Sequence, residues 1–431
     1  MHIYFSGIGG AGIGPLAFIA HQAGFTVSGS DAKRNLTVQY LEAKGVPNIH
    51  IGQDYDQIAA VHAKNHIDWF VHTSALPIDQ PDAPELKFCA EHHIRTSKRD
   101  EFLRYLLEQK DLKMIAVAGT HGKTTTTAMA VWLCKQLGMP ISYSVGAKLS
   151  FGEMGEFDPA SEYFVYEADE YSRNFLAFHP HISLISGVGW DHPDIYPTRA
   201  EYYEAFRVFL GQSNQKIIWQ NDLANLGYEP DEHTTIVDKA DPRLNDLTLP
   251  GLVNRQNALL VIEALHTLTG KSFAELTGHM NRFPGVSRRF EQLAPRLYTD
   301  YAHTPPKIRG ALQLAHEVAG PQVVVVYEGL HNTRQHFIKD ELKDLFEDVK
   351  QLYIVPSYLA REDPDLAILT PDDLKQLMNE KTRSRTTATA LDDRLKDAIK
   401  HHLYDGDLVL CLTAGGGGSL DEWLRTAFTK R

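Results

Sequence analysis

The sequence predicts an α/β protein whose parallel sheets are covered by helices on both faces. Short apolar segments typical of buried strands alternate with helix-length segments along the chain, which is the pattern of such sheets. Two glycine-rich turns, at 7–12 and 119–122, each follow a strand-like segment and precede a helix-like one, as nucleotide-binding turns do. The 431 residues are enough for about three domains of ordinary size. We expect the domains 1–109, 110–289 and 290–431, because charged or Pro-Gly segments lie at both junctions.

The first domain is predicted to begin with a strand, a glycine turn and a helix. The strand is His2–Phe5, the turn spans 7–12, and the helix continues to about Gly24 before a second strand, Phe25–Ser28. Asp31 follows the last glycine of the turn by about twenty residues, the spacing of the acid that binds a ribose hydroxyl in dinucleotide sites. Taken alone, this fingerprint suggests NAD. The alternative is that the glycines only let a helix pack closely on a strand.

The second domain opens with the most specific motif of the chain. It is Gly119-Thr-His-Gly-Lys-Thr-Thr-Thr126, which follows the apolar segment Met114–Ala118. A strand, a glycine-rich turn and a helix start form a phosphate cradle, because backbone N–H groups and the helix dipole face the anion. In such a cradle Lys123 reaches the outer phosphates and the Thr124 hydroxyl ligates magnesium. Two phosphate sites in one chain favour a nucleotide-linked substrate together with ATP over a dehydrogenase.

Acidic residues end two predicted strands of the same domain. Glu167-Ala-Asp-Glu170 ends one strand, and Asp191-His192 follows the strand His181–Ser186. Carboxylates are the hard oxygen ligands that Mg²⁺ prefers, and a neutral imidazole can complete the shell of a second metal ion. Acids beside a phosphate cradle therefore predict magnesium, with two ions. Solvated strand ends and a capping histidine are the alternatives.

The third domain repeats the alternation of strands and helices. Strand-like segments lie at Arg296–Asp300, Gln322–Tyr327, Gln351–Val355 and Asp407–Leu412, with helix-length segments between them. This spacing predicts a third parallel sheet with helices on its faces.

Charge and composition exclude several classes of protein. A formal net charge of −12 with a pI near 5.9 argues against nucleic acid or an anionic membrane as a partner, because both require clustered Lys and Arg. The sequence has no run of 18 apolar residues that would suggest a membrane span, and no Lys or Arg before Lys33, as a signal peptide would need. The three cysteines are far apart, which suits a reducing cytosol. We expect a cytoplasmic protein that is a monomer or a homodimer.

These motifs occur in the order found in the Mur ligases, and the chain resembles that family. The segments that carry the resemblance are 7–14, 28–31, 73–77, 119–126, 167–170, 191–192, 254–257, 283–290, 300–303 and 333–334. The resemblance implies a three-domain Mur ligase architecture with a Rossmann-like UDP-binding domain, a P-loop ATPase central domain and a Rossmann-like C-terminal domain. It also implies UDP-N-acetylmuramate and ATP as substrates, with Mg²⁺.

The resemblance assigns roles to residues in all three domains. UDP-sugar binding is implied for Gly9, Gly10, Ala11, Gly12, Ile13, Ser30, Asp31 and Ser74. ATP binding is implied for Gly119, Thr120, His121, Gly122, Lys123, Thr124, Thr125, Asn254, Asn257 and Asp300. The implied metal ligands are Thr124, Glu167 and His192. The implied catalytic residues are Lys123, His192, His303 and Arg334.

The reaction that the resemblance implies is ATP-dependent amide-bond formation in cytoplasmic peptidoglycan precursor synthesis. The lactyl carboxylate of UDP-N-acetylmuramate would take the γ-phosphoryl group of ATP, and the amine of L-alanine would attack the acyl phosphate. Two alternatives remain. One is a ligase that joins the same UDP-sugar to a murein tripeptide for recycling, and the other is a nucleotide-binding regulator that keeps the fold without turnover.

The chain departs from the alanine-adding pattern at several positions. Gly187 stands where these enzymes usually carry Asn, and Val253 stands where they carry His. Gly329-Leu-His-Asn-Thr-Arg334 replaces the usual Pro-His-Arg-Tyr-Thr-Arg, so His331 occupies the place of the first arginine. Phe206 lies where other Mur ligases have a carbamylated lysine, which is similar to the alanine-adding and tripeptide-recycling branches. These residues leave open whether the acceptor is an amino acid or a tripeptide.

Overall fold

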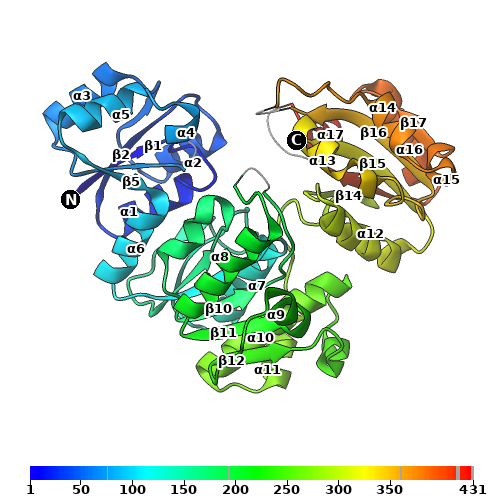
Figure 1. Cartoon of the computed structure of the whole chain (residues 1–431), viewed down its shortest axis with the longest axis horizontal. Helices are drawn as coiled ribbons and strands as arrows, with labels where there is room; N and C mark the ends of the chain where they lie inside the picture. The colour runs from blue at the N-terminus through cyan, green and yellow to red at the C-terminus, as the bar shows by residue number, and fades with distance from the viewer. Residues whose placement is uncertain (75, 193–194, 360–361, 414–417, 429–431) are drawn as a thin grey trace. The chain divides into compact units, whose positions relative to one another are not determined.

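The structure is a computed structural model that describes residues 1–74, 76–192, 195–359, 362–413 and 418–428. It confirms the predicted α/β class, because the described residues form three sheets with helices packed on them (Figure 1). The chain divides into two compact units. The first unit contains Met1–Leu247 and Asn257–Phe283, and the second contains Thr248–Gln256 and Pro284–Arg431.

The first sheet has five parallel strands in the order β3-β2-β1-β4-β5. The strands are β1 (His2–Ser6), β2 (Thr26–Asp31), β3 (Ile49–Ile51), β4 (Trp69–His72) and β5 (Arg95–Lys98). The helices are α1 (Gly14–Gln22), α2 (Leu36–Ala43), α3 (Tyr55–Lys64), α4 (Leu76–Asp79), α5 (Pro84–Glu91) and α6 (Arg99–Gln109). Both faces of the sheet are buried, since Phe5 packs with α1 and α6 and Tyr4 packs with α3 and α5. This two-sided burial is typical of a parallel sheet.

The second sheet has seven strands in the order β12-β11-β10-β6-β9-β7-β8. The strands are β6 (Lys113–Ala118), β7 (Ile141–Ser144), β8 (Gly155–Glu156), β9 (Tyr163–Glu167), β10 (Ile182–Ile185), β11 (Gln215–Trp219) and β12 (Thr234–Val237). The helical segments are α7 (Lys123–Gln136), η1 (Tyr171–Ala177), α8 (Arg199–Gln212), α9 (Gln220–Leu226), η2 (Pro242–Asp246), α10 (Leu252–Thr269) and α11 (Phe273–Met280). Strand β6 lies between β10 and β9, and all three are parallel. Their carboxyl ends therefore meet at one edge, where such sheets bind ligands.

The third sheet has six strands in the order β13-β14-β18-β15-β16-β17, of which β13 and β14 pair antiparallel. The strands are β13 (Glu291–Ala294), β14 (Leu297–Asp300), β15 (Val323–Leu330), β16 (Gln351–Tyr358), β17 (Thr386–Ala388) and β18 (Leu408–Leu412). The helices are α12 (Pro305–Ala319), α13 (Asn332–Leu342), α14 (Pro371–Leu377), α15 (Glu380–Arg383), α16 (Asp393–Tyr404) and α17 (Leu420–Phe428). Val325 packs with α12, α13 and α14, while Val326 packs with α16 and α17 on the other face.

One apolar core runs through the first two sheets of the first unit. It joins Phe5 of β1 and Phe102 of α6 to Phe164 of β9 and Phe206 of α8. Phe206 is fully buried in this core. Among the described residues, none of the helices is long and apolar enough to cross a membrane.

Candidate active site

The phosphate cradle consists of the end of β6, the turn 119–122 and the start of α7. Gly119 and Gly122 have φ angles of 142° and 81°, values that favour glycine. A Cβ at Gly119 would lie 2.5 Å from Ser186 Oγ, so the turn packs directly against the end of β10. No described side chain caps α7, which begins at Lys123. The N–H groups of its first turn and the helix dipole favour an anion at this position, and the phosphate site stays a prediction.

The ammonium group of Lys123 lies between the cradle and the acids that follow β9. Its Nζ donates to the Gly119 carbonyl at 2.6 Å and to Glu170 Oε2 at 2.7 Å, and the Glu170 side chain is 1% exposed. Burial acts to lower the pKa of Lys123, but Glu170 and Asp169 outweigh burial and raise this pKa. Lys123 is therefore cationic at neutral pH, as a phosphate ligand must be.

Two of the predicted metal ligands are neighbours at the start of α7. Thr124 Oγ1 donates to Glu167 Oε1 at 2.8 Å, and Glu167 Oε2 accepts the Gly146 N–H at 3.1 Å. A hydroxyl and a carboxylate beside a phosphate cradle are hard oxygen donors, which suit Mg²⁺. The chemistry of this pair fits a magnesium ion bound together with nucleotide phosphates.

His192, the third predicted metal ligand, lies beside Glu170 and Asp191. Its Nε2 is 3.8 Å from Glu170 Oε1 and 3.9 Å from Asp191 Oδ2. Within the parts of the chain that the structure describes, no group of three or more His, Cys, Asp or Glu side chains is arranged to hold a metal ion. The set of Thr124, Glu167 and His192 therefore stays a prediction.

The His121 imidazole occupies the space beside Gly187. A Cβ at Gly187 would lie 2.3 Å from His121 Cε1, and Gly187 has a φ of 153°. Thr120 ties the same turn to the chain after β10, since its N–H donates to the Gly187 carbonyl at 2.8 Å and its Oγ1 to the Gly189 carbonyl at 2.6 Å. The His121 ring thus fills the space that a side chain at position 187 would need.

The two predicted adenine-site asparagines lie one turn apart on α10. Asn257 is 3% exposed, and its Oδ1 would lie 3.0 Å from a Cβ at Gly122. Asn254 Nδ2 donates to the Pro250 carbonyl at 2.9 Å. The structure therefore brings Asn257 to the phosphate cradle. Thr125, predicted to bind ATP, is buried in the first turn of α7.

The predicted UDP-sugar residues surround the turn between β1 and α1. This turn contains Gly9, Gly10, Ala11, Gly12 and Ile13. Asp31 Oδ2 accepts the Gly9 N–H at 2.8 Å, and Asn35 Nδ2 donates to the Gly9 carbonyl at 3.2 Å. Ser74 Oγ donates to Asn174 Oδ1 of the middle domain at 2.9 Å. Asp31 thus holds the shape of the turn, a role that the spacing argument missed.

A buried carboxylate that the sequence analysis missed joins the ends of β1 and β2. Glu85 is 1% exposed, and its carboxylate accepts Tyr4 Oη at 2.9 Å, Ser6 Oγ at 2.6 Å and Ser30 Oγ at 2.5 Å. Burial raises the pKa of Glu85, while the hydroxyl donors lower it in part. Ser30, predicted to bind the UDP-sugar, therefore points its hydroxyl at Glu85. No sequence signal links Glu85 to Tyr4, because 81 positions separate them.

The second unit holds a buried neutral histidine, His303, and a half-buried acid, Asp300. His303 Nδ1 is 3.0 Å from the Tyr301 carbonyl, which can only accept, so Nδ1 carries the hydrogen and Nε2 carries the lone pair. Burial lowers the pKa of His303 well below its ordinary value, and Lys307 and Arg334 lower it further. Burial also raises the pKa of Asp300 to about 6, against the effect of Arg289. Arg289 and Lys307 therefore act on both Asp300 and His303, whereas Arg334 acts on His303.

Glu362 is a second acid that the sequence analysis missed. Its Oε2 accepts the Thr333 N–H at 2.9 Å, and its Oε1 lies 3.6 Å from His331 Nδ1. His331 precedes α13 with a φ of 57°. The residue that replaces the first family arginine thus faces a carboxylate at the N-terminus of this helix.

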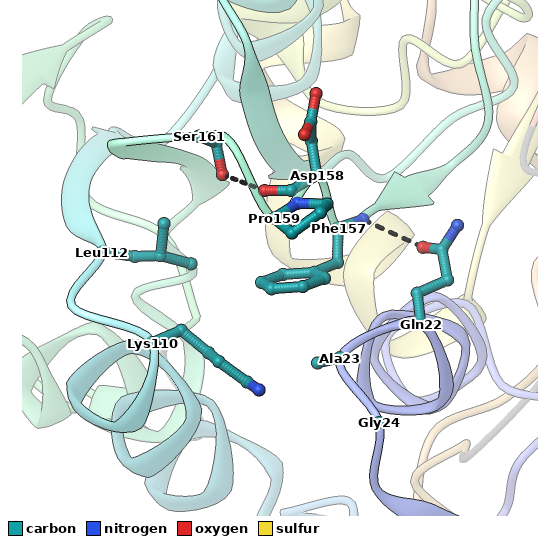
Figure 2. Close-up of a pocket in the computed structure, with 9 residues that line it drawn as sticks. All are labelled: Gln22, Ala23, Gly24, Lys110, Leu112, Phe157, Asp158, Pro159 and Ser161. Carbon is teal, nitrogen blue, oxygen red and sulfur yellow. Dashed lines mark hydrogen bonds between the residues drawn. The ribbon is translucent and has the colours of Figure 1, made fainter.

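A separate cavity of about 340 Å³ lies at the C-terminal end of α1 (Figure 2). Its lining residues are Gln22, Ala23, Gly24, Lys110, Leu112, Phe157, Asp158, Pro159 and Ser161. The Phe157 N–H donates to Gln22 Oε1 at 2.9 Å and ties the middle domain to α1. None of the predicted site residues lines this cavity. The glycine turn lies at the opposite end of α1.

Sequence models of one protein family match three segments of the chain. The Mur ligase catalytic domain matches residues 2–111, the Mur ligase middle domain matches 117–232, and the Mur ligase glutamate ligase domain matches 288–415. The chain belongs to the Mur ligase family. The expected three-domain architecture is therefore confirmed, and ATP, on which this family depends, is supported as a substrate.

Relatives of this Mur ligase match it over nearly its whole length. A protein of Frankia casuarinae named UDP-N-acetylmuramate–L-alanine ligase is 29% identical, over 96% of this chain and 95% of its own. A protein of Agathobacter rectalis with the same name is 29% identical, over 98% of this chain and 97% of its own.

Solved structures share the fold of this Mur ligase. The UDP-N-acetylmuramate-alanine ligase of Thermotoga maritima has a TM-score of 0.74 at 24% identity, with 96% of each chain covered. A murein peptide ligase of Psychrobacter arcticus has a TM-score of 0.64 at 21% identity, with 100% of this chain and 99% of its own covered. These two likenesses concern the fold and do not choose between the two acceptors.

Proposed function

We propose that this Mur ligase joins L-alanine to the lactyl carboxylate of UDP-N-acetylmuramate, at the expense of ATP and through an acyl phosphate. The observation that carries the proposal is the match over 96% of the chain to proteins named for that reaction. The phosphate cradle with a charged Lys123 supports it. In this proposal the protein acts in the cytoplasm as a monomer or a homodimer. Its three domains are residues 1–109, 110–289 and 290–431.

In the proposed reaction the residues of the cradle bind ATP. The N–H groups at the start of α7 and the Lys123 ammonium hold the phosphates, and Asn257 lies against the same turn. Thr124 and Glu167 would hold one Mg²⁺, and His192 would take part in holding a second. Bound there, magnesium supplies positive charge that offsets the charge of the transferring phosphoryl group.

The first chemical step activates a carboxylate that is otherwise a poor electrophile. An oxygen of the lactyl carboxylate bonds to the γ-phosphorus while the bond from that phosphorus to the bridging oxygen of ADP breaks. Lys123 offsets the charge on the phosphoryl oxygens, and its position is fixed by Glu170 and the Gly119 carbonyl. The products of this step are ADP and an acyl phosphate.

The second step forms the amide. The neutral amine of L-alanine bonds to the acyl carbon, and the carbon–oxygen bond to the phosphate then breaks, which releases inorganic phosphate. His303 Nε2 accepts an N–H of the amine and orients it, because Nδ1 carries the fixed hydrogen. As the amide forms, its nitrogen loses one proton to His303 Nε2, and because the pKa of His303 is lowered, the imidazole passes this proton to the departing phosphate. Arg334 stabilises the oxyanion on the acyl group.

The two ligase candidates differ in the acceptor that they join to the UDP-sugar, which is an amino acid in one and a tripeptide in the other. The segment His331-Asn-Thr333 is similar to the tripeptide-recycling branch. We therefore keep the tripeptide-recycling ligase as the second candidate.

Phosphate release by the purified protein tests the proposal. The assay contains ATP, Mg²⁺ and UDP-N-acetylmuramate, with L-alanine, glycine, L-serine or L-Ala-γ-D-Glu-diaminopimelate added in parallel. Release that depends on L-alanine supports the proposed ligase. Release with the tripeptide alone identifies the recycling ligase, and no release with any acceptor favours a regulator or a different UDP-sugar.

A further inference from the structure

The predicted UDP-sugar site lacks a cation. Its residues are glycines, small side chains, two hydroxyl groups and the acid Asp31, whereas a UDP-sugar presents a negatively charged diphosphate. The whole chain has a net charge of −12, so its overall field opposes the binding of such an anion. A diphosphate at the glycine turn therefore requires local positive charge.

The structure places the Arg99 guanidinium directly on this turn. Arg99 is the first residue of α6, and a Cβ at Gly12 would lie 1.8 Å from its Nη1. The guanidinium thus fills the space above Gly12, where a Cβ would displace it. Gly12 therefore leaves room for the Arg99 guanidinium beside the turn where the UDP-sugar is predicted to bind.

Two carboxylates hold Arg99 in this position. Its Nε lies 3.5 Å from Asp100 Oδ1, and its Nη2 lies 3.6 Å from Asp169 Oδ2. Asp100 is 2% exposed and also accepts Tyr166 Oη at 3.1 Å. Arg99 itself keeps 20% of its side chain exposed. A guanidinium has five N–H donors in a planar fork, so these two pairs leave it able to bind a phosphate as well.

We infer that Arg99 binds the diphosphate of the UDP-sugar and gives the site its preference for a nucleoside diphosphate over a monophosphate. The inference rests on the proposed function for the identity of the ligand. The same guanidinium contacts Asp169 between Glu167 and Glu170, so Arg99 also connects the UDP-sugar turn to the acids of the ATP site.

Calorimetric titration of the full-length protein with UDP and with UMP, without ATP or metal, tests the inference. The substitution Arg99→Met should weaken UDP binding roughly 10- to 100-fold, the loss expected for charge-assisted hydrogen bonds, and should leave UMP binding nearly unchanged. Equal losses for UDP and UMP, or unchanged UDP binding, would overturn the inference.

Two further variants separate binding from folding. Arg104→Met is the matched control, because Arg104 lies on the same helix, is 50% exposed and pairs with Glu108. It should leave the affinity for UDP unchanged. Arg99→Lys keeps the charge beside Asp100 and should lower the ratio of UDP to UMP affinity less than Arg99→Met does. If the Met variant does not fold, an unaltered ratio in the Lys variant refutes the inference.

The proposed function and this inference fail in different ways. Wild-type protein that prefers UDP to UMP through Arg99 but forms no product with L-alanine would refute the function and support the inference. Full ligase activity with an unaltered UDP preference in Arg99→Met would support the function and refute the inference.

Discussion

Removal of the Lys123 ammonium should strongly lower turnover and also destabilise the fold. Lys123 pairs with Glu170 at 2.7 Å, and the two side chains are 14% and 1% exposed. Loss of one partner from a buried ion pair costs about 3–5 kcal/mol, because the remaining charge stays buried without compensation. Loss of one group that stabilises charge in the transition state lowers kcat roughly 10²- to 10³-fold.

The variants Lys123→Met and Lys123→Met/Glu170→Gln separate these two effects. The double variant removes the unpaired carboxylate, so it should regain most of the lost stability in urea unfolding, while phosphate release should stay roughly 10²- to 10³-fold below that of the wild type. Lys135→Met is the matched control, because Lys135 lies on the same helix and pairs with Glu156 at 2.8 Å but is 28% exposed. It should cost less than about 1 kcal/mol. Near-normal phosphate release by Lys123→Met would refute the assigned role of the lysine.

Three further predictions concern pH and packing. The raised pKa of Asp300, about 6, together with the predicted contact of its ionised form with the ribose, predicts that the KM for ATP falls as pH rises through this value. The same pH dependence in Asp300→Asn would contradict this. Burial lowers the pKa of His62, and His66 and His92 lower it further. The unfolded chain therefore binds a proton at His62 more readily than the folded chain does, so the free energy of unfolding should decrease as pH falls below 6.5, the ordinary pKa of histidine. The variant His62→Gln should show a smaller decrease, and an equal decrease would exclude His62 as the cause. Gly187→Ala should lower the thermal midpoint and raise the KM for ATP, because its Cβ would meet the imidazole beside it; unchanged values would show that the ring moves at no cost.

Local sequence patterns were sufficient to predict the elements that form the glycine-rich cradle. The cradle follows from one apolar strand, two glycines and a helix start within about a dozen residues, since neighbours in sequence decide that geometry. The edge of the second sheet follows from the alternation of strands and helices, which places the ends of parallel strands together. The ordered motifs also predicted the Mur ligase architecture that the family matches confirm.

Partners that lie far apart in the sequence could not be predicted. Glu85 reaches Tyr4 across 81 positions, and Arg99 reaches Asp169 across the boundary between two domains. A single acid or arginine has no periodicity that would indicate its partner, so these contacts depend on how complete elements pack. The hydrogen bond from the Gly9 N–H to Asp31 was missed for another reason, because the spacing of the fingerprint suggests a ligand contact and not a bond within the chain.

Oxygen transfer tests the central claim of an acyl phosphate most directly. UDP-N-acetylmuramate labelled with ¹⁸O in its lactyl carboxylate is incubated with ATP, Mg²⁺, L-alanine and the protein, and the inorganic phosphate is analysed by mass spectrometry. An acyl phosphate requires that one labelled oxygen pass from the carboxylate to the released phosphate, with the UDP-sugar product heavier by one alanine residue. Unlabelled phosphate would show that the carboxylate never bonds to the γ-phosphorus and would contradict the proposed mechanism.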